Sequence, residues 1–192
     1  MYEAVMVISQ GQNNKVALVN IYLLKQQFSS IKPLLETMSQ FSYPSFLDLL
    51  GCYCWEDQVF LVWESVELSV SHILVSRYTI TKGKVAAIVR LVLEGIQCLH
   101  SRGRALAALS ADTILLTESG RVSIAGVERS CQIDTAEMDA VTLKLFALAE
   151  VVERLIMKNP LYYPWSAEAK GLPKELKSCS SPEELLCSKL FE

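Results

Sequence analysis

The feature that most restricts the possible folds is the segment at residues 81–100, TKGKVAAIVRLVLEGIQCLH. Apolar side chains recur in it every three or four residues, which predicts a long amphipathic helix. One apolar stripe cannot form a core alone, so other parts of the chain must cover it. The residues predicted on the buried face are Val85, Ile88, Val92, Ile96 and Leu99.

Before this helix the sequence predicts two pairs of strands and one short helix. Residues 1–9 and 15–24 are rich in Val, Ile and Tyr and favour a hairpin across the turn GQNN. Residues 28–41 fit a short helix with Pro33 in its first turn. The segments FLDLLGCYCW and QVFLVWE favour a second pair of strands.

After residue 100 the pattern becomes mainly helical. The segments TILLT and RVSIA predict a short hairpin, and SPEELL begins a helix in which Ser181 and Glu184 would form a capping box. Residues 139–157 predict a helix with one main stripe, Val141, Leu145, Leu148, Val152 and Leu155. Further apolar residues lie off this stripe, so we expect a central helix: Leu143, Phe146 and Val151. The whole order predicts an α+β protein.

Composition excludes several classes of function. With 192 residues, 51% hydrophobic and 20% charged, the chain fits one domain or two small lobes. A net charge of −3 gives no electrostatic reason to expect nucleic acid or an anionic membrane as a partner. The apolar runs are too short to span a bilayer, and MYEAVMVISQ lacks the regions of a signal peptide. We therefore expect a cytoplasmic protein that contacts neither membrane nor nucleic acid.

The six cysteines do not predict a metal site. Cys52 and Cys54 would face the same side of a strand, but His72 and His100 lie in no metal-ligand spacing. We interpret the cysteines as reduced apolar thiols and expect no metal ion and no cofactor. Three loop carboxylates could in principle hold a metal, but we interpret them as solvated: Asp112, Glu128 and Asp134.

In the order of its motifs the chain resembles a protein kinase. The segment VLEGIQCLHSRGRALAALSADTILLTESGRVSIAG is similar, without a gap, to kinase helix E, the catalytic loop, the next strand pair and the start of the magnesium loop. SYPSFLDLLGCYCWEDQVFLVWE resembles the segment after helix C, strands 4 and 5 and the hinge. WSAEAKGLPKELKSCSSPEELLCSKLF resembles the last kinase subdomain. The sequence as a whole is most similar to those of divergent fungal kinase-like domains.

This resemblance implies a two-lobe, protein kinase-like α+β fold. Residues 1–66 would form a truncated small lobe of β-hairpins plus one helix, without a Gly-rich loop. Residues 67–192 would form a reduced, mainly helical large lobe with a shortened activation segment. Asp139 would open the central helix at the helix-F Asp position, where it either ties the catalytic loop or only caps the helix.

The resemblance also implies that the reactive groups are gone. Phosphoryl transfer needs a strand-3 Lys paired with a helix-C Glu, a catalytic base and two magnesium ligands. In this chain other residues stand at the positions of the strand-3 Lys, the helix-C Glu, the catalytic-loop His, Asp and Lys, and the magnesium Asn and Asp. In that order they are Val19, Leu34, Leu106, Ala108, Ser110, Thr113 and Gly126.

Apolar residues remain at the positions that shape the pocket. The resemblance implies a remnant nucleotide pocket formed by Ala17, Trp63, Glu64 and Val66. Trp63 falls at the gatekeeper position, where an indole would project toward the adenine pocket, or simply fill the core, or both. Three more apolar residues fall where kinases stack side chains between the lobes: Met38, Leu106 and Val127.

These residues predict a catalytically inactive pseudokinase that acts as a protein-interaction or scaffold module, with a partner that the sequence does not identify. One alternative is a nucleotide-sensing pseudokinase that binds ATP without phosphate transfer. Four features argue against it: Val19, Trp63, Gly126 and the missing Gly-rich loop. An active enzyme of altered chemistry is opposed by the same losses and by Ala108. A decayed or truncated gene product with no selected activity remains open.

Overall fold

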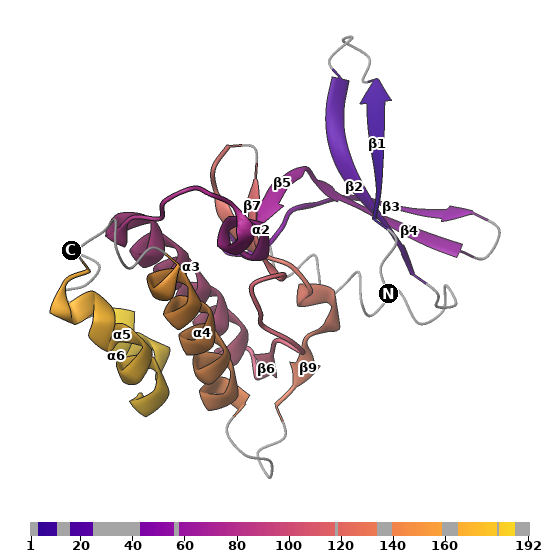
Figure 1. Cartoon of the computed structure of the whole chain (residues 1–192). Helices are drawn as coiled ribbons and strands as arrows, with labels where there is room; N and C mark the ends of the chain where they lie inside the picture. Colours follow the sequence, from indigo (N-terminus) through magenta and orange to yellow (C-terminus); the bar gives the residue numbers. More distant parts are fainter. Residues whose placement is uncertain are drawn as a thin grey trace.

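The computed structural model describes residues 4–10, 16–24, 43–55, 58–117, 119–133, 140–158, 165–179 and 181–186. Within these ranges the chain is a mixed structure of small sheets and helices. Figure 1 shows the first two hairpins projecting from one side of a body that contains the long helices. The helix predicted at residues 28–41 lies outside the described residues.

In the described residues the first sheet has four antiparallel strands. They are β1 (Ala4–Gln10), β2 (Val16–Leu24), β3 (Leu49–Trp55) and β4 (Gln58–Glu64), in the order β1-β2-β4-β3. Both predicted strand pairs are therefore confirmed, and β2 joins them by pairing with β4. Alternate residues of β4 are buried, which is the period-two pattern of a strand with one covered face: Val59, Leu61 and Trp63.

The second sheet has three strands and lies against the helices. It consists of β5 (Val66–Ser69), β7 (Ile114–Thr117) and β8 (Val122–Ile124), in the order β5-β7-β8. The predicted TILLT–RVSIA hairpin is thus confirmed as β7 and β8. A third, two-stranded pairing joins β6 (Arg104–Ala105) to β9 (Cys131–Gln132).

Two long helices form the centre of the helical body. Helix α3 (Lys82–His100) buries all five residues predicted for its apolar face. Helix α4 (Ala140–Met157) buries its predicted stripe and also Val151. The prediction that α4 is covered on its other faces is wrong near its start, because Leu143 is 52% and Phe146 43% exposed. Helices α3 and α5 (Ala167–Ser178) both pack against α4.

The last helix that the structure describes, α6 (Pro182–Leu186), packs on α3. Gln97 Nε2 donates a hydrogen bond to Glu183 Oε1 at 3.0 Å across this contact. Ser181 Oγ accepts from the backbone N–H of Glu183 at 3.2 Å, so Ser181 caps the helix as predicted. The Glu184 carboxylate instead accepts from Cys179 Sγ at 3.1 Å, which differs from the predicted capping box.

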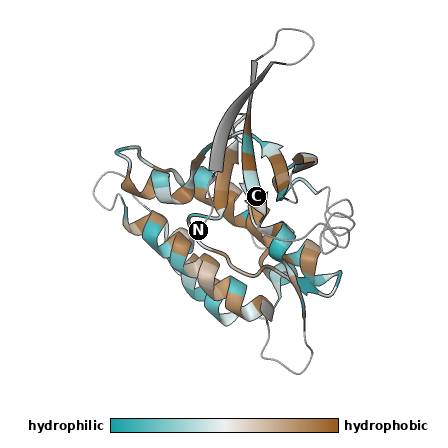
Figure 2. Ribbon diagram, turned by 90° about the vertical axis from the view of Figure 1, so that its right-hand side faces the viewer, coloured by the Kyte–Doolittle hydropathy of each residue, from teal (hydrophilic) through white to brown (hydrophobic). Residues whose placement is uncertain are grey.

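The core lies between α3, α4 and the second sheet. Short α2 (Val70–Val75) connects β5 to the segment before α3. The helical ribbons alternate between hydrophobic and hydrophilic stretches in Figure 2, as amphipathic helices do. Helix α3 approaches β8 closely at Gly95, where a built Cβ would lie 2.6 Å from Ile124 Cδ1. Among the described helices, none has the length and apolar character needed to cross a membrane.

Candidate functional site

A cavity of about 280 Å³ lies where the first sheet meets the segment after β8. Strands β2 and β4 contribute Tyr22 and Trp63, and the turn before β7 contributes Asp112 and Thr113. The remaining wall comes from residue 47, from β7 and from the segment 124–129. Most of the wall is apolar, including Leu47, Leu115, Ile124 and Val127.

The backbone conformation at Gly126 determines where the side chains of Val127 and Glu128 lie. Gly126 has a φ of +89°, which a residue without a Cβ adopts at little cost. The chain then makes a single 3₁₀ turn over Val127–Arg129. This turn buries the side chain of Val127 and places Glu128 in the cavity wall.

The turn before β7 closes on itself through two polar side chains. Thr113 Oγ1 accepts from the backbone N–H of Ser110 at 2.9 Å and donates to the Ser110 carbonyl at 3.1 Å. Ser110 Oγ accepts from the backbone N–H of Asp112 at 3.3 Å. Ser110 and Thr113, which stand at the catalytic-loop Lys and magnesium-Asn positions of the kinase resemblance, therefore use their hydroxyls to hold this turn together.

The structure brings some of the predicted site residues together. Trp63, Thr113 and Gly126 line the same cavity, and so does Val127. Ala108 is exposed on the loop and does not belong to this wall. Leu106 is buried at 2% exposure and lies with Val141 at a different, very small cavity near the start of α4.

Other predicted residues lie apart from the cavity. Val19 is buried in β2 opposite Glu64 of β4, and Val66 pairs with Thr117 in the second sheet. Glu64 borders a separate open depression with Ser65, Thr117 and Ser119. Ala17 belongs to β2. Four predicted residues lie outside the described part of the chain: Leu34, Met38, Asp134 and Asp139.

The carboxylate of Glu64 is engaged in a structural network. Its Oε1 accepts from the backbone N–H of Asp48 at 3.0 Å and contacts the Arg121 guanidinium. The backbone carbonyl of Glu64 accepts from Asn20 Nδ2 at 3.1 Å. The residue that the kinase resemblance places in the hinge therefore ties three segments together.

Glu128 is the site residue that sequence reasoning underestimated. We interpreted it as a solvated carboxylate, but its side chain is only 13% exposed. Oε1 lies 3.6 Å from Arg129 Nε, and Oε2 is shielded from solvent without a hydrogen-bond partner among the described residues. Burial raises the pKa of Glu128, although a backbone hydrogen bond acts in the opposite direction. The signal available in the sequence was Gly126, which permits a turn that directs the following residues inward.

Tyr22 shares the environment of Glu128. Burial raises the pKa of the Tyr22 hydroxyl, and the nearby Glu128 carboxylate raises it further. In both groups burial therefore makes ionisation more costly. The described residues contain no cluster of three or more His, Cys, Asp or Glu side chains that could hold a metal ion.

Comparison with known proteins supports the kinase resemblance. The chain is 32% identical over 102 residues to the serine/threonine-protein kinase Tao of Drosophila melanogaster, which is 53% of this chain and 10% of that protein. It is 24% identical over 157 residues to CST20 of Candida albicans, 74% of this chain and 13% of that kinase. It is 24% identical over 135 residues to STE20 of Saccharomyces cerevisiae, 69% of this chain and 14% of that kinase. No protein-family model matches the chain.

These relatives are serine/threonine kinases of animals and fungi, and they support a relationship to the protein kinase superfamily. The chain spans about 10 to 15% of the length of the curated relatives that it matches. The arrangement of small sheets and a few helices is consistent with part of a kinase-like fold.

Proposed function

We propose that this chain is a catalytically inactive kinase-like domain that functions by binding another protein. The observation that carries the proposal is the chemistry of the cavity beside Trp63. Its wall includes two carboxylate residues, Asp112 and Glu128, and one cationic residue, Arg129, which lies beside Glu128. A nucleotide triphosphate needs the opposite charge around its phosphates.

The individual positions support the loss of catalysis. Val19, at the strand-3 Lys position, is an apolar buried side chain. The hydroxyl of Thr113, at the magnesium-Asn position, is used within its own turn. Ala108 and Gly126 offer no acid at the base and metal positions. Together these replacements remove the catalytic base, the metal ligands and the phosphate clamp that phosphoryl transfer needs.

The two-lobe arrangement is part of the same proposal. Strand β4 ends at Glu64, and β5 begins at Val66 in the other sheet. This change of sheet supports a small lobe to residue 66 and a large lobe from residue 67. The cavity then corresponds to what is left of the nucleotide site between the lobes.

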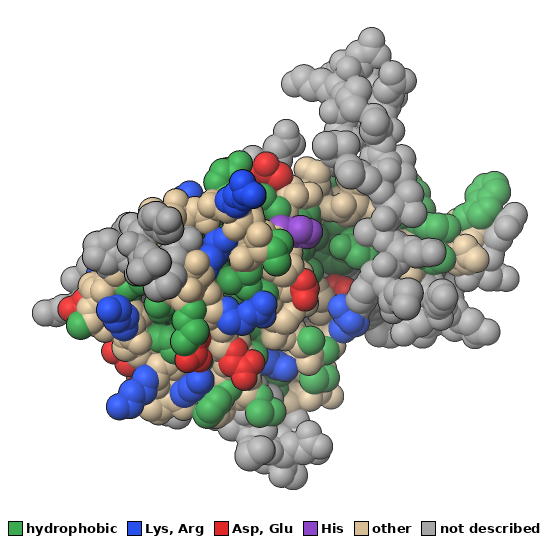
Figure 3. Space-filling model, viewed as in Figure 1, with side chains coloured by type: hydrophobic (Ala, Val, Ile, Leu, Met, Phe, Trp, Pro, Cys, Tyr) green, Lys and Arg blue, Asp and Glu red, His purple; other side chains and the backbone are tan. Residues whose placement is uncertain are grey.

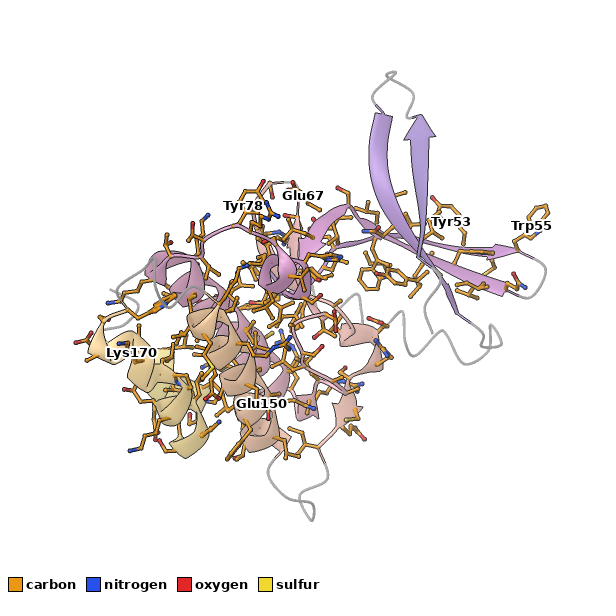
Figure 4. The ribbon with its side chains drawn as sticks, viewed as in Figure 1. Tyr53, Trp55, Glu67, Tyr78, Glu150 and Lys170 are labelled. Carbon is orange, nitrogen blue, oxygen red and sulfur yellow. The ribbon has the colours of Figure 1, made fainter. Side chains whose placement is uncertain are left out.

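Exposed aromatic side chains support the binding role. Tyr53 is 63% and Trp55 70% exposed on β3, which is an edge strand of the first sheet. Figure 4 shows both side chains on the hairpin that projects away from the helices. Figure 3 shows hydrophobic side chains at the same extremity, whereas charges of both signs are mixed over the helical body. Large exposed aromatic residues are typical of protein-binding surfaces.

The catalytic half of the proposal is tested with ATP and magnesium. A ligand at one hundred times its dissociation constant stabilises a protein by about 2.7 kcal/mol, which raises the melting temperature by several degrees. We expect no such shift with millimolar MgATP and no phosphate transfer to generic protein substrates. A reproducible rise in melting temperature would instead favour the nucleotide-sensing alternative.

The binding half is tested on the aromatic pair. We expect proteins captured from a lysate of the source organism by the parent chain to be lost with Tyr53→Ser/Trp55→Ser. Tyr78→Ser is the matched control, because Tyr78 is 80% exposed but lies on the helical body (Figure 4). If the double variant and the control capture the same proteins, the surface on β3 is not the binding surface.

A further inference from the structure

The cavity beside Trp63 has features of a ligand site of its own. Its volume of about 280 Å³ is just below the lower end, about 300 Å³, of typical small-molecule pockets, so it suits a small ligand. It is partly open to solvent, and its wall is mainly apolar with a few polar groups. This composition is the one that binds small organic molecules with a defined orientation.

The polar groups of the wall set the sign of the ligand's charge. Among the described residues of the wall, Asp112 and Glu128 are acidic and Arg129 is basic, half exposed, with its Nε 3.6 Å from Glu128. That distance is too long for a hydrogen bond, so the ion pair satisfies Glu128 only in part. The cavity therefore disfavours an anion and favours a cation.

Glu128 is the residue of the wall that a hydrogen-bond donor on a ligand would stabilise most. Its Oε2 is shielded from water and has no hydrogen-bond partner among the described residues. A buried polar atom without a partner is costly, and a cationic donor would remove that cost. The terminal torsion of a Glu side chain is soft, so the carboxylate can turn this oxygen toward the cavity.

The apolar wall favours an organic cation over a metal ion. Trp63 contributes an indole, whose face attracts ammonium and guanidinium-like groups. We propose that this cavity binds a small organic monocation, an amine or amidinium with an apolar body. The charged nitrogen of this ligand donates a hydrogen bond to the Glu128 carboxylate. The apolar body of the ligand packs against Trp63, Leu47 and Ile124. The site goes beyond the inactive-kinase proposal and does not depend on it.

The test uses three probes of one shape and different charge: benzamidine, which is cationic at neutral pH, neutral benzamide and anionic benzoate. Binding to the purified chain is measured by titration calorimetry and thermal shift. We expect benzamidine to bind at least about tenfold more tightly than benzamide, because a hydrogen bond to a charged group contributes more than a neutral one. Benzoate should be the weakest of the three.

Two variants locate the ligand. Glu128→Gln keeps the shape of the side chain and should reduce the affinity for benzamidine to that for benzamide. The control is Glu150→Gln at an exposed position of α4, which should leave the affinity for benzamidine unchanged. Ala125→Met narrows the cavity and should weaken benzamidine and benzamide alike. The proposal is overturned by equal binding of the two probes or by no binding of benzamidine. It is overturned equally by full affinity in Glu128→Gln or in folded Ala125→Met.

Discussion

Arg121 Nη2 lies 3.1 Å from Asp48 Oδ2, across the junction between the first and second sheets. The same guanidinium contacts Glu64 Oε1 and donates to the Pro44 carbonyl at 3.2 Å. A single side chain, one residue before β8, therefore holds the end of β4 and the segment 44–48. The planar guanidinium suits this role because it carries several donors in a fixed arrangement.

Arg121→Ala should destabilise the chain by about 1.5–3 kcal/mol, because partly buried hydrogen bonds to charged groups are lost. The matched control is Arg90→Ala on α3. Within the described ranges Arg90 pairs with Glu94 alone, at 3.1 Å on the helix surface, and such pairs contribute about 0.3–0.5 kcal/mol. Urea unfolding of both variants measures the difference. Equal losses would mean that the junction does not depend on Arg121.

Gly95→Ala should destabilise the chain although alanine favours helices. Its Cβ would lie 2.6 Å from Ile124 Cδ1 and 3.1 Å from Ser45 Cβ, and Ile124 is fully buried and cannot move aside freely. Overpacking of this kind costs about 1–3 kcal/mol.

Gly83→Ala is the control for Gly95→Ala in the same helix, because no atom of the described residues lies within 4 Å of the position that its Cβ would take. This variant should be stabilised by about 0.4–1 kcal/mol through helix propensity and the reduced freedom of the unfolded chain. Thermal unfolding of the two variants should therefore shift in opposite directions. A stabilised Gly95→Ala would show that α3 is not tightly packed on β8.

The helices and strands were predictable because the spacing of apolar residues along the sequence indicates which face of an element is buried. In α3 the apolar spacing alone identified Val85, Ile88 and Leu99, and all three are buried. In α4 the same reasoning failed for Phe146, because hydrophobicity does not say whether another element covers that side of the helix.

The cavity was only partly predictable. Trp63, Thr113 and Gly126 were identified from the order of motifs, and the structure places them around the same cavity. The burial of Glu128 was missed, because its environment depends on a turn permitted by the positive φ of Gly126 and on how the first sheet approaches it. Such contacts join residues that are far apart in the sequence and leave no local pattern.

Leu106→Asp should cost about 3 kcal/mol or more, because it places a carboxylate where Leu106 is 2% exposed. Leu143→Asp makes the same chemical change at a 52% exposed position of α4 and should cost less than about 1 kcal/mol. Chemical denaturation of the two variants measures the contrast. If Leu106→Asp is as stable as the parent, the apolar packing between the loop and α4 is not as described.

Glu128→Gln should stabilise the chain at neutral pH, because it removes a buried carboxylate whose Oε2 has no hydrogen-bond partner in the described part of the chain. The folded state raises the pKa of Glu128 above its ordinary value of 4.5, so the folded chain holds this proton more tightly than the unfolded chain. Stability from this group is therefore present below pH 4.5 and is lost as the pH rises through the folded pKa.

The gain from Glu128→Gln should consequently be small below pH 4.5 and increase above it to a plateau. The ionisable groups that line the cavity with Glu128, as far as the structure describes it, are Tyr22, Asp112 and Arg129, and all three are retained in the variant. Glu150→Gln controls for the loss of one negative charge. Melting temperatures across the pH range measure the gain, and a gain that does not change with pH would contradict the burial of a titrating carboxylate.

Ala108→Asp should not restore phosphate transfer. Residue 108 is exposed, so the variant should fold like the parent, within about 0.5 kcal/mol. Groups that act as a unit are strongly non-additive, so a base returned without metal ligands and a phosphate clamp recovers little.

Adding Gly126→Asp tests the metal position, but a residue with a Cβ at a φ of +89° brings a backbone strain of about 1–2 kcal/mol. The double variant is therefore first checked for a cooperative thermal transition. Both proteins are then assayed for transfer of labelled phosphate to generic substrates. Activity above that of the parent in either protein would mean that Val19, Ser110 and Thr113 do not exclude catalysis, and the inactive-kinase proposal would have to be abandoned.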